Sequence, residues 1–386
     1  MALRDHARDG RRRRVTRLSG LVIGIATVAG SACGPTAEPA LPPGPPRLVL
    51  LYAPCTVTRA HLSPYRPSIV YTPRLQEFAR QAITFQRHQT EAESSGIAYA
   101  SLFTGSQADR HGVFHHPSPV NQDTHGIFEA FAEAGYDPFY WHAHKMARAN
   151  LGYGQGVPAQ NAPDRELRAS DPLFEQVLGR LERDPDYRAM VVTNLTITHG
   201  PYQPHALAAF SKAYPELYSS RETSSRARYA DLYRKNHFAL AWNFPHALRM
   251  LDLDAQEISE LSQVLTLTYA ANVYELDRRF GAILDAIDAR GLGPHSLVAF
   301  TADHGEVLHN EAAIYQWSHS LQLAPEVLTV PWLLRAPGLP PCERWDTSSD
   351  GSPVRSSPAT CKIVGSRLRR LPRSVRMAAR PSPPLP

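Results

Sequence analysis

The sequence predicts an α/β domain in which a mostly parallel central sheet is flanked by helices. The first observation behind this prediction is a set of short apolar runs, which are typical of buried strands. The second is that helical segments separate these runs along the chain, as in layered α/β domains. The runs that we interpret as strands are Arg47–Tyr52 (RLVLLY), Met190–Leu195 (MVVTNL) and Leu297–Thr301 (LVAFT).

The clearest helix is the segment that ends at Arg290-Gly291, where the glycine supplies a C-terminal stop. Its apolar residues recur at the spacing that lines one face of a helix. With 386 residues, of which 43% are apolar, the chain is long enough to bury the core of one large domain. The residues with helical spacing are Leu276, Phe280, Ile283, Leu284 and Ile287.

The formal charge of +5 is concentrated at the two ends of the chain. Residues 1–20 contain seven Arg and two Asp, about +5, and residues 341–386 contain eight Arg, one Lys and three acids, about +6. Subtracting both from +5 leaves about −6 for residues 21–340. A phosphate-backbone interface needs a basic face on the folded domain, so we expect no nucleic-acid partner.

The first 33 residues are typical of a signal peptide. An Arg-rich stretch precedes the apolar run Leu21–Gly30, which is too short to span a membrane, and small residues then lead to Cys33. Lipidation of Cys33, which would anchor the chain to a membrane, and cleavage after Ala32 without a lipid are both open. Residues 34–46 form a Pro-rich spacer. We therefore expect an exported protein of the periplasm or cell envelope.

The segment after the third predicted strand carries the chemistry that points most directly to a function. Asp303, His304 and Glu306 follow the strand at once, and Gly305 lets the chain turn between them. A carboxylate oxygen and a neutral imidazole suit divalent ions such as Mn, Zn or Mg, and an adjacent Asp-His pair can direct both side chains at one ion. In α/β sheets the ligand site lies beyond the carboxyl ends of the strands. The sequence therefore predicts a metal site at this position.

This segment resembles the C-terminal metal motif of the sulfatase family of the alkaline-phosphatase-like superfamily. Further segments resemble that family in its own order along residues 47–338, which we expect to form the catalytic domain. The resemblance implies an alkaline-phosphatase-like layered fold and one divalent metal ion (Mn, Zn, Ca or Mg). The segments are Tyr71–Leu75 (YTPRL), Ala100–Gly105 (ASLFTG), Arg110–Val113 (RHGV), His199–Tyr202 (HGPY), Trp317–Ser320 (WSHS) and Val330–Gly338 (VPWLLRAPG).

The family register places the nucleophile five residues before Ala100, at Ser95. A serine at the start of a helix would have unpaired backbone N–H groups and the positive end of the helix dipole beside it, which favour an anionic group. On residue type alone, the interpretation of Ser94 or Ser95 as a simple N-cap is favoured. With the family register, we expect Ser95 to be the nucleophile and a third metal ligand.

Two departures from the family pattern change the expected chemistry. The formylglycine that sulfatases make at this position requires a proline two residues on and an arginine four on, where this chain has Ile97 and Tyr99. We therefore expect unmodified serine, and this shifts the expectation toward phosphate esters. The family's metal-binding aspartate after the first strand is also absent. Cys55 falls near its place, either as a thiolate ligand of the metal or as a small buried residue.

Three further residues are expected in the site because of the segments in which they lie. His199, in the HGPY segment, is expected to donate to the transferring group or to protonate the leaving group. His319, in the closing segment, is the next candidate, and Lys145 corresponds more loosely to a lysine of the family. Position after a predicted strand or in a matched segment distinguishes these residues from surface side chains.

Residues 339–386 are rich in Arg, Ser and Pro and show no helical or strand periodicity. We expect a basic, disordered tail or the product of a reading-frame shift, and we favour the shift because the composition changes abruptly after a matched motif. Relatives continue here into a small C-terminal subdomain. That subdomain has no counterpart in the sequence, so we expect it to be missing.

Three functions remain open at this point. The leading hypothesis is an exported, metal-dependent hydrolase of sulfate or phosphate esters, with a small-molecule, glycan or lipid ester as substrate. A catalytically silent binding protein that keeps the fold is the second. An exported transferase of phospho-head-groups is the third.

Overall fold

The computed structural model describes residues 44–219, 226–310, 315–319 and 321–339. The chain divides into two compact units, Met1–Pro39 and Ala40–Pro386, and every described residue belongs to the second. The expected signal peptide, most of the spacer and all of the expected tail after Leu339 therefore lie outside the described residues. The expected absence of a C-terminal subdomain is likewise not tested by them. Within the described part of the chain, no helix combines the length and apolar character needed to cross a bilayer.

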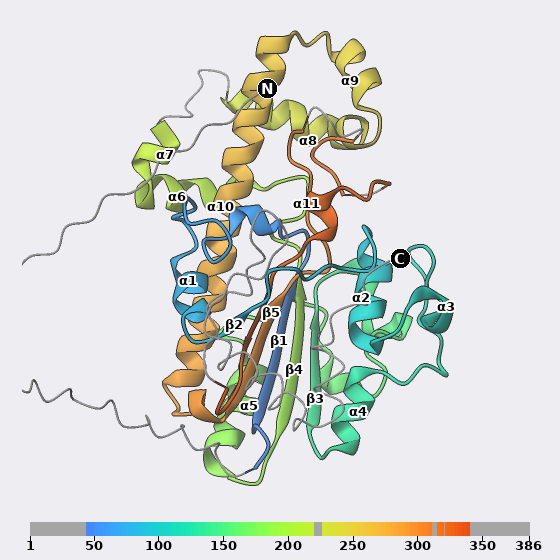
Figure 1. Ribbon diagram of the computed structural model, residues 1–386, viewed down its shortest axis with the longest axis vertical. Helices are drawn as coiled ribbons and strands as arrows, with labels where there is room; N and C mark the ends of the chain where they lie inside the picture. The colour runs from blue at the N-terminus through green and yellow to red at the C-terminus, as the bar shows by residue number, and fades with distance from the viewer. Residues whose placement is uncertain (1–43, 220–225, 311–314, 320, 340–386) are drawn as a thin grey trace, which may run out of the picture. The chain divides into compact units, whose positions relative to one another are not determined.

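A six-stranded sheet with the order β2-β6-β5-β1-β4-β3 forms the centre of the second unit (Figure 1). Strand β1 pairs in parallel with β4 and β5, and β3 pairs in parallel with β4. Strand β6 runs antiparallel to both β5 and β2. The strands are β1 (Leu48–Pro54), β2 (Ile83–Thr84), β3 (Asp137–His142), β4 (Ala189–Leu195), β5 (Ser296–Thr301) and β6 (Trp332–Arg335).

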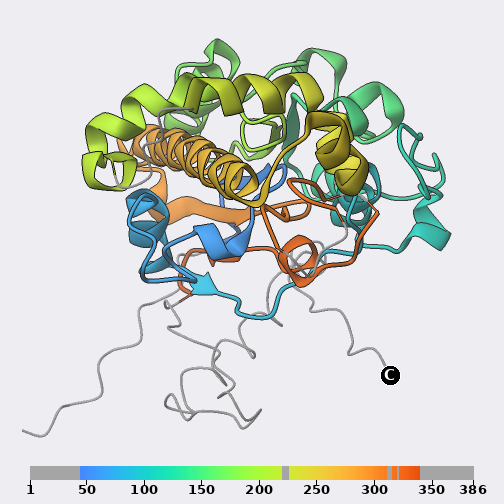
Figure 2. The same cartoon turned by 90° about the horizontal axis from the view of Figure 1, so that it is seen from above.

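The helices lie between the strands in the alternating order that the sequence predicts, which confirms the α/β fold class. They are α1 (Pro73–Ala79), α2 (Ser95–Thr104), α3 (Ala108–His111), α4 (Ile127–Glu133), α5 (Pro172–Arg183), α6 (Leu207–Ala213), α7 (Pro215–Ser219), α8 (Arg226–Trp242), α9 (Phe244–Leu251), α10 (Ala255–Asp288) and α11 (Pro325–Leu328). The helix expected to end at Gly291 is α10, which runs for 34 residues from the capping box at Asp254. Figure 2 shows α8 beside α10.

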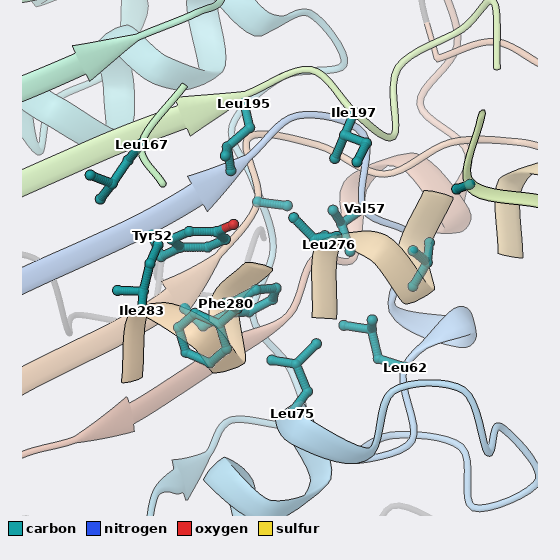
Figure 3. Close-up of a cluster of buried hydrophobic side chains, with 14 of the residues drawn as sticks. Tyr52, Val57, Leu62, Leu75, Leu167, Leu195, Ile197, Leu276, Phe280 and Ile283 are labelled. Carbon is teal, nitrogen blue, oxygen red and sulfur yellow. The ribbon is translucent and has the colours of Figure 1, made fainter. Parts of the chain in front are cut away.

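Alternate residues of β1 face two separate apolar cores, because successive side chains of a strand point to opposite faces of the sheet. Leu48, Leu50 and Tyr52 belong to the core that contains residues of α1, α5 and α10. Figure 3 shows part of this core, where Tyr52 lies beside Phe280 of α10. Val49 and Leu51 belong to the core on the other face, with residues of α2 and α4. Burial on both faces explains why β1 is apolar at every position.

Asp277 joins α1 to α10 through the backbone. Its two carboxyl oxygens accept hydrogen bonds from the amides of Arg74, at 3.0 Å, and Leu75, at 2.7 Å. These amides lie in the first turn of α1, where backbone N–H groups have no partner within the helix. The carboxyl is fully buried. Asp277 thus satisfies the start of α1 and fixes it against the long helix.

Asp277 also provides a prediction about pH. Burial raises the pKa of Asp277 to about 7, well above the ordinary value of an aspartate, because the charged form loses its hydration. An acid with a raised pKa in the fold contributes stability that is complete below its unfolded pKa and is lost as pH rises through the folded value. The unfolding free energy of the wild type should therefore fall, relative to that of Asp277→Asn, as pH rises from about 4 to about 7.

Denaturant unfolding of both proteins across this pH range measures the difference. Asparagine keeps one acceptor and does not titrate, so Asp277→Asn should lose about 1 kcal/mol from the second hydrogen bond at low pH. A difference between the two proteins that stays constant or grows in favour of the wild type as pH rises would contradict the assignment.

Candidate functional site

The turns that leave the parallel strands bring the expected site residues to one edge of the sheet. Cys55 follows β1, His199 lies in the segment after β4, and the Asp303-His304 pair follows β5. Ser95 is the first residue of α2. The carboxyl ends of neighbouring parallel strands share an edge, which is where α/β domains place their ligands.

Hydrogen bonds fix the turn after β1 to the turn after β5. Asp303 Oδ1 accepts from the amide of Thr56 at 3.1 Å and from the amide of His304 at 2.7 Å. The Thr58 hydroxyl donates to the carbonyl of Glu306 and accepts from its amide, both at 2.8 Å. Thr56 has a φ of 55°, an uncommon backbone conformation for a β-branched residue. The strained turn directs its amide at Asp303 and carries Cys55 toward the same carboxylate.

Four potential metal ligands meet behind this pair of turns. Ser95 Oγ lies 3.0 Å from His304 Nε2 and 3.4 Å from Cys55 Sγ. His304 Nε2 lies 3.4 Å from Asp303 Oδ2. One ligand atom each of Cys55, Asp303 and His304 fall within 4.8 Å of one another. The structure therefore brings together all four residues that the sequence predicts as ligands.

The hydrogen bonding of this cluster leaves two electron-pair donors facing each other. His304 Nδ1 is 2.9 Å from the carbonyl of Gly305 and must donate to it, which assigns the lone pair to Nε2. The Ser95 hydroxyl can donate to Nε2, but Asp303 Oδ2 is buried without a hydrogen-bond partner among the described residues. A buried carboxylate oxygen beside an imidazole lone pair favours a cation between them. The residues present therefore fit a divalent metal ion.

The protonation states also suit metal binding. Burial lowers the pKa of His304 to about 4, which keeps the imidazole neutral. Burial alone would raise the pKa of Asp303, but His304 and His144 hold it below its ordinary value, so the carboxylate is ionised. Burial, together with nearby Asp303, raises the pKa of Cys55 well above its usual range. The thiol thus keeps its proton until a cation displaces it.

A second group of possible ligands shares Cys55 with the first. One ligand atom each of Cys55, His144 and His199 also lie within 4.8 Å of one another. However, His144 Nδ1 accepts from the amide of Met146 at 3.2 Å, which places the ring proton on Nε2 in the neutral form. Burial lowers the pKa of His144 to about 3, so the ring is neutral. His144 is therefore a hydrogen-bond donor toward the site, and the group lacks a third ligand.

Ser95 begins α2 without capping it. Ser94 occupies the N-cap position with an extended backbone, and its side chain makes no cap hydrogen bond. The Ser95 side chain points instead to Cys55 and His304. Tyr99, one turn later, donates from its hydroxyl to the carbonyl of Ala53 at 2.8 Å. This bond ties α2 to the end of β1 and holds Ser95 over the cluster.

A cleft of about 550 Å³ opens beside Ser95. It is lined by Ser95, Lys145, His199 and His319, which are all of the expected catalytic residues. Asp303, His304 and Cys55 are at most 1% exposed and lie behind Ser95. Access from solvent to the cluster therefore passes along the cleft and past the serine.

Two of the cleft histidines have a ring nitrogen fixed by an acceptor. His319 Nδ1 lies 3.3 Å from Glu306 Oε1, and His199 Nδ1 contacts the carbonyl of Gly200. The carbonyl of Gly200 can only accept, so His199 donates from Nδ1–H and its Nε2 is free to exchange a proton with a substrate. Glu306 accepts from His319 Nδ1–H when it is ionised and can donate to Nδ1 when it is protonated. The ring centroids of His199 and His319 are 5.1 Å apart. Burial raises the pKa of Glu306 to about 8.

The structure adds to the cleft four titratable residues for which the sequence assigned no role. His144 lies just past β3, so the rule that polar residues after a strand form the site would have identified it had β3 been predicted. Glu306 was noted only as part of the metal segment. His116 and His237, from a loop and from α8, carry no signal in one sequence. These four residues line the cleft: His116, His144, His237 and Glu306.

Comparison with known proteins decides the family. The Sulfatase family model matches residues 56–349, well over half of the chain. The chain belongs to the sulfatase family. An ulvan-active sulfatase of Formosa agariphila is 23% identical over 70% of this chain and 52% of its own length. A multifunctional alkaline phosphatase superfamily protein of Trinickia caryophylli is 22% identical over 63% of this chain and 59% of its own length.

Solved structures show the same fold. A protein solved in complex with its substrate D-glucosamine-2-N,6-O-disulfate superposes with a TM-score of 0.55 at 16% identity, covering 76% of this chain and 72% of its own. This sulfatase-family chain spans between half and three fifths of the length of the two curated relatives. The family assignment thus covers the fold, and the roles of the site residues and the activity of the whole protein are separate questions.

Gly305, between the predicted ligand His304 and Glu306, provides a prediction about the integrity of the site. A Cβ on Gly305 would lie 2.0 Å from the carbonyl oxygen of Glu326, a backbone atom that cannot move away as a side chain can. The Gly305 amide also donates to the carbonyl of Val327 at 2.7 Å. We expect Gly305→Ala to lower the unfolding free energy by at least about 3 kcal/mol and to weaken metal binding.

Gly179→Ala is the matched control. Gly179 lies inside α5, and its Cβ would meet only the end of the flexible Arg183 side chain. Because alanine favours a helix over glycine, this variant should gain about 0.5–1 kcal/mol. Denaturant unfolding measures both variants. Equal effects of the two substitutions would contradict the close backbone approach at Gly305.

Proposed function

We propose that this protein is an exported, metal-dependent hydrolase of sulfate or phosphate esters, with Ser95 as the nucleophile. The divalent ion would be held by Asp303, His304, Cys55 and Ser95. The observation that carries the proposal is the unsatisfied Asp303 Oδ2, which faces the lone pair of His304 next to the Ser95 hydroxyl, at the inner end of the cleft.

Ser95 would attack the phosphorus or sulfur of the ester. The Oγ–H bond breaks and its proton passes to solvent, a bond forms from Oγ to the central atom, and the bond to the leaving oxygen breaks. Water then cleaves the covalent intermediate and restores the serine. A serine phosphoester can be hydrolysed, whereas a serine sulfate ester tends to persist, so unmodified Ser95 favours phosphate esters. The bound ion would polarise the ester oxygen and lower the pKa of the Ser95 hydroxyl.

The cleft supplies the groups that hold the ester. The first turn of α2 presents unpaired backbone N–H groups and the positive end of its dipole at Ser95, where negative charge collects. His144, through Nε2–H, and the exposed Lys145 would donate to the remaining oxygens. Both follow β3, so their placement depends on the same strand.

His199 and His319 would move protons during the reaction. In the protonated state His199 keeps its Nδ1–H on the carbonyl of Gly200 and can pass the Nε2 proton to the leaving oxygen. His319 is held in the corresponding orientation by the hydrogen bond between its Nδ1 and Glu306 Oε1. Two oriented imidazoles allow one to protonate the leaving group and the other to activate water.

Separate alanine substitutions of the two adjacent serines test which residue is the nucleophile. Ser95→Ala should lower kcat/KM by at least about a thousandfold, because the attacking oxygen is gone. Ser94→Ala should stay within about tenfold of the wild type, because Ser94 makes no cap hydrogen bond. Turnover of aryl sulfate, aryl phosphate and aryl phosphodiester substrates measures both, with Asp303→Ala as the metal-site variant.

The same assay separates the proposal from its alternatives. Activity that survives both Ser95→Ala and Asp303→Ala would exclude this site. Wild-type protein that is inactive on all three substrate classes would favour a silent binding protein. Mass spectrometry of the peptide that contains Ser95 distinguishes plain serine, a phosphoryl adduct and formylglycine, and the adduct is the expected trapped species.

Esters whose leaving groups differ in basicity test whether His199 is the general acid. His199→Ala should cost about a hundredfold to ten-thousandfold on an alkyl ester, whose oxygen must be protonated as it leaves. On a 4-nitrophenyl ester, whose leaving group is stable without the proton, the loss should be much smaller. His246→Ala, on the exposed side of α9, is the matched histidine control. Equal losses on both esters would remove the role of acid from His199.

A further inference from the structure

The turn after β1 presents sulfur where a carboxylate would be expected for a hard cation. Cys55 is fully buried, and its Sγ lies 3.4 Å from Ser95 Oγ and 4.0 Å from His304 Nε2. The backbone of Cys55 is held on both sides: its amide donates to the carbonyl of Leu195 at 2.8 Å, and its carbonyl accepts from the Thr198 hydroxyl at 2.6 Å. The sulfur is therefore positioned by the fold.

A second observation shows that this position faces a ligand. Asp303 is only 1% exposed, and its Oδ2 has no hydrogen-bond partner among the described residues. The atoms of Cys55, Asp303 and His304 converge within 4.8 Å, the size of one coordination sphere. Together with Ser95 Oγ, the set is one sulfur, one nitrogen and two oxygens.

We propose that Cys55 is a thiolate ligand and that it makes this centre select Zn²⁺ over Ca²⁺, Mg²⁺ and Mn²⁺. Thiolate and imidazole ligands suit Zn²⁺, whereas Ca²⁺ and Mg²⁺ require mostly oxygen ligands and larger numbers of them. Four converging side-chain atoms match the tetrahedral number of zinc. On binding, the S–H bond breaks, a Zn–S bond forms, and the proton passes to solvent.

The charges of the ligands support a divalent ion of this kind. The ionised Asp303 carboxylate and one thiolate carry two negative charges, which balance the charge of Zn²⁺. The neutral His304 directs its Nε2 lone pair inward because Nδ1–H is held by the carbonyl of Gly305. The inference rests on the metal centre of the proposed function. Its test measures metal content and the spectrum of the bound metal rather than turnover.

Two substitutions of Cys55 provide the test. The full-length protein and its variants are expressed in medium supplemented with Zn²⁺ or Co²⁺, and bound metal is measured by mass spectrometry. The wild type should contain one Zn²⁺ per chain. Its Co²⁺ form should show a near-ultraviolet thiolate-to-cobalt charge-transfer band and the intense visible absorption of tetrahedral cobalt. Cys55→Ser should lose the band and at least about a hundredfold in zinc affinity.

Cys55→Asp replaces the sulfur with a hard oxygen ligand. This variant should also lose the charge-transfer band but keep a metal, with its preference shifted from Zn²⁺ toward Mg²⁺, Mn²⁺ or Ca²⁺ in competition. Cys342→Ser and Cys361→Ser are the matched cysteine controls and should leave the band unchanged. Retention of the band in Cys55→Ser, or its absence from cobalt-loaded wild type, would overturn the proposal, as would two zinc ions per chain.

These results are separable from those of the proposed function. A zinc–thiolate centre in a protein that turns over no ester would leave the metal inference standing and refute the hydrolase. Turnover that depends on Ser95, with Mg²⁺ or Ca²⁺ bound and no thiolate band, would do the reverse. Metal content and spectrum are also measured for Ser95→Ala. This variant should keep zinc through the other three ligands although it lacks the proposed nucleophile.

Discussion

The two hydrogen bonds that Asp303 Oδ1 accepts are the interaction on which the rest of the site depends. They join the amide of Thr56, after β1, to the turn after β5, and thereby bring Cys55 beside His304. Because Oδ1 is used in this way, Oδ2 is left to face the cluster. One carboxylate thus both closes the loops and contributes the charge that a cation requires. Removing it would disorganise the ligands as well as remove one of them.

The fold could be predicted to the extent that its strands are buried on both faces. Such strands are apolar without interruption, and β1, β4 and β5 begin within one residue of the predicted runs. Strand β3 was missed because Asp137-Pro138 opens it with two residues that are rare in strands. Asp303 and His304 are adjacent, so local sequence predicts their pairing. The contact of His319 with Glu306 depends on the antiparallel bridge between Val307 and Ser318, which local sequence does not predict.

The two residues that depart from the sulfatase pattern, Tyr99 and Cys55, make contacts that hold the fold together. Tyr99 stands where formylglycine formation requires an arginine, and its hydroxyl instead ties α2 to Ala53 at the end of β1. Cys55 takes up the place near the absent aspartate with its backbone bonded to Leu195 and Thr198. Helix α2 is thus held by a neutral hydrogen bond. The scaffold has remained while the polar groups that it carries have changed.

The near-complete burial of Cys55, Asp303 and His304, at 0%, 1% and 0% exposure, has a kinetic consequence. An ion held among them can leave only when one of the two turns opens or Ser95 moves aside. Opening the turns breaks the bonds of Thr58 to Glu306 and of Thr56 to Asp303 together. Exchange of an ion bound there would therefore be coupled to movement of these turns or of Ser95, and it would be slow.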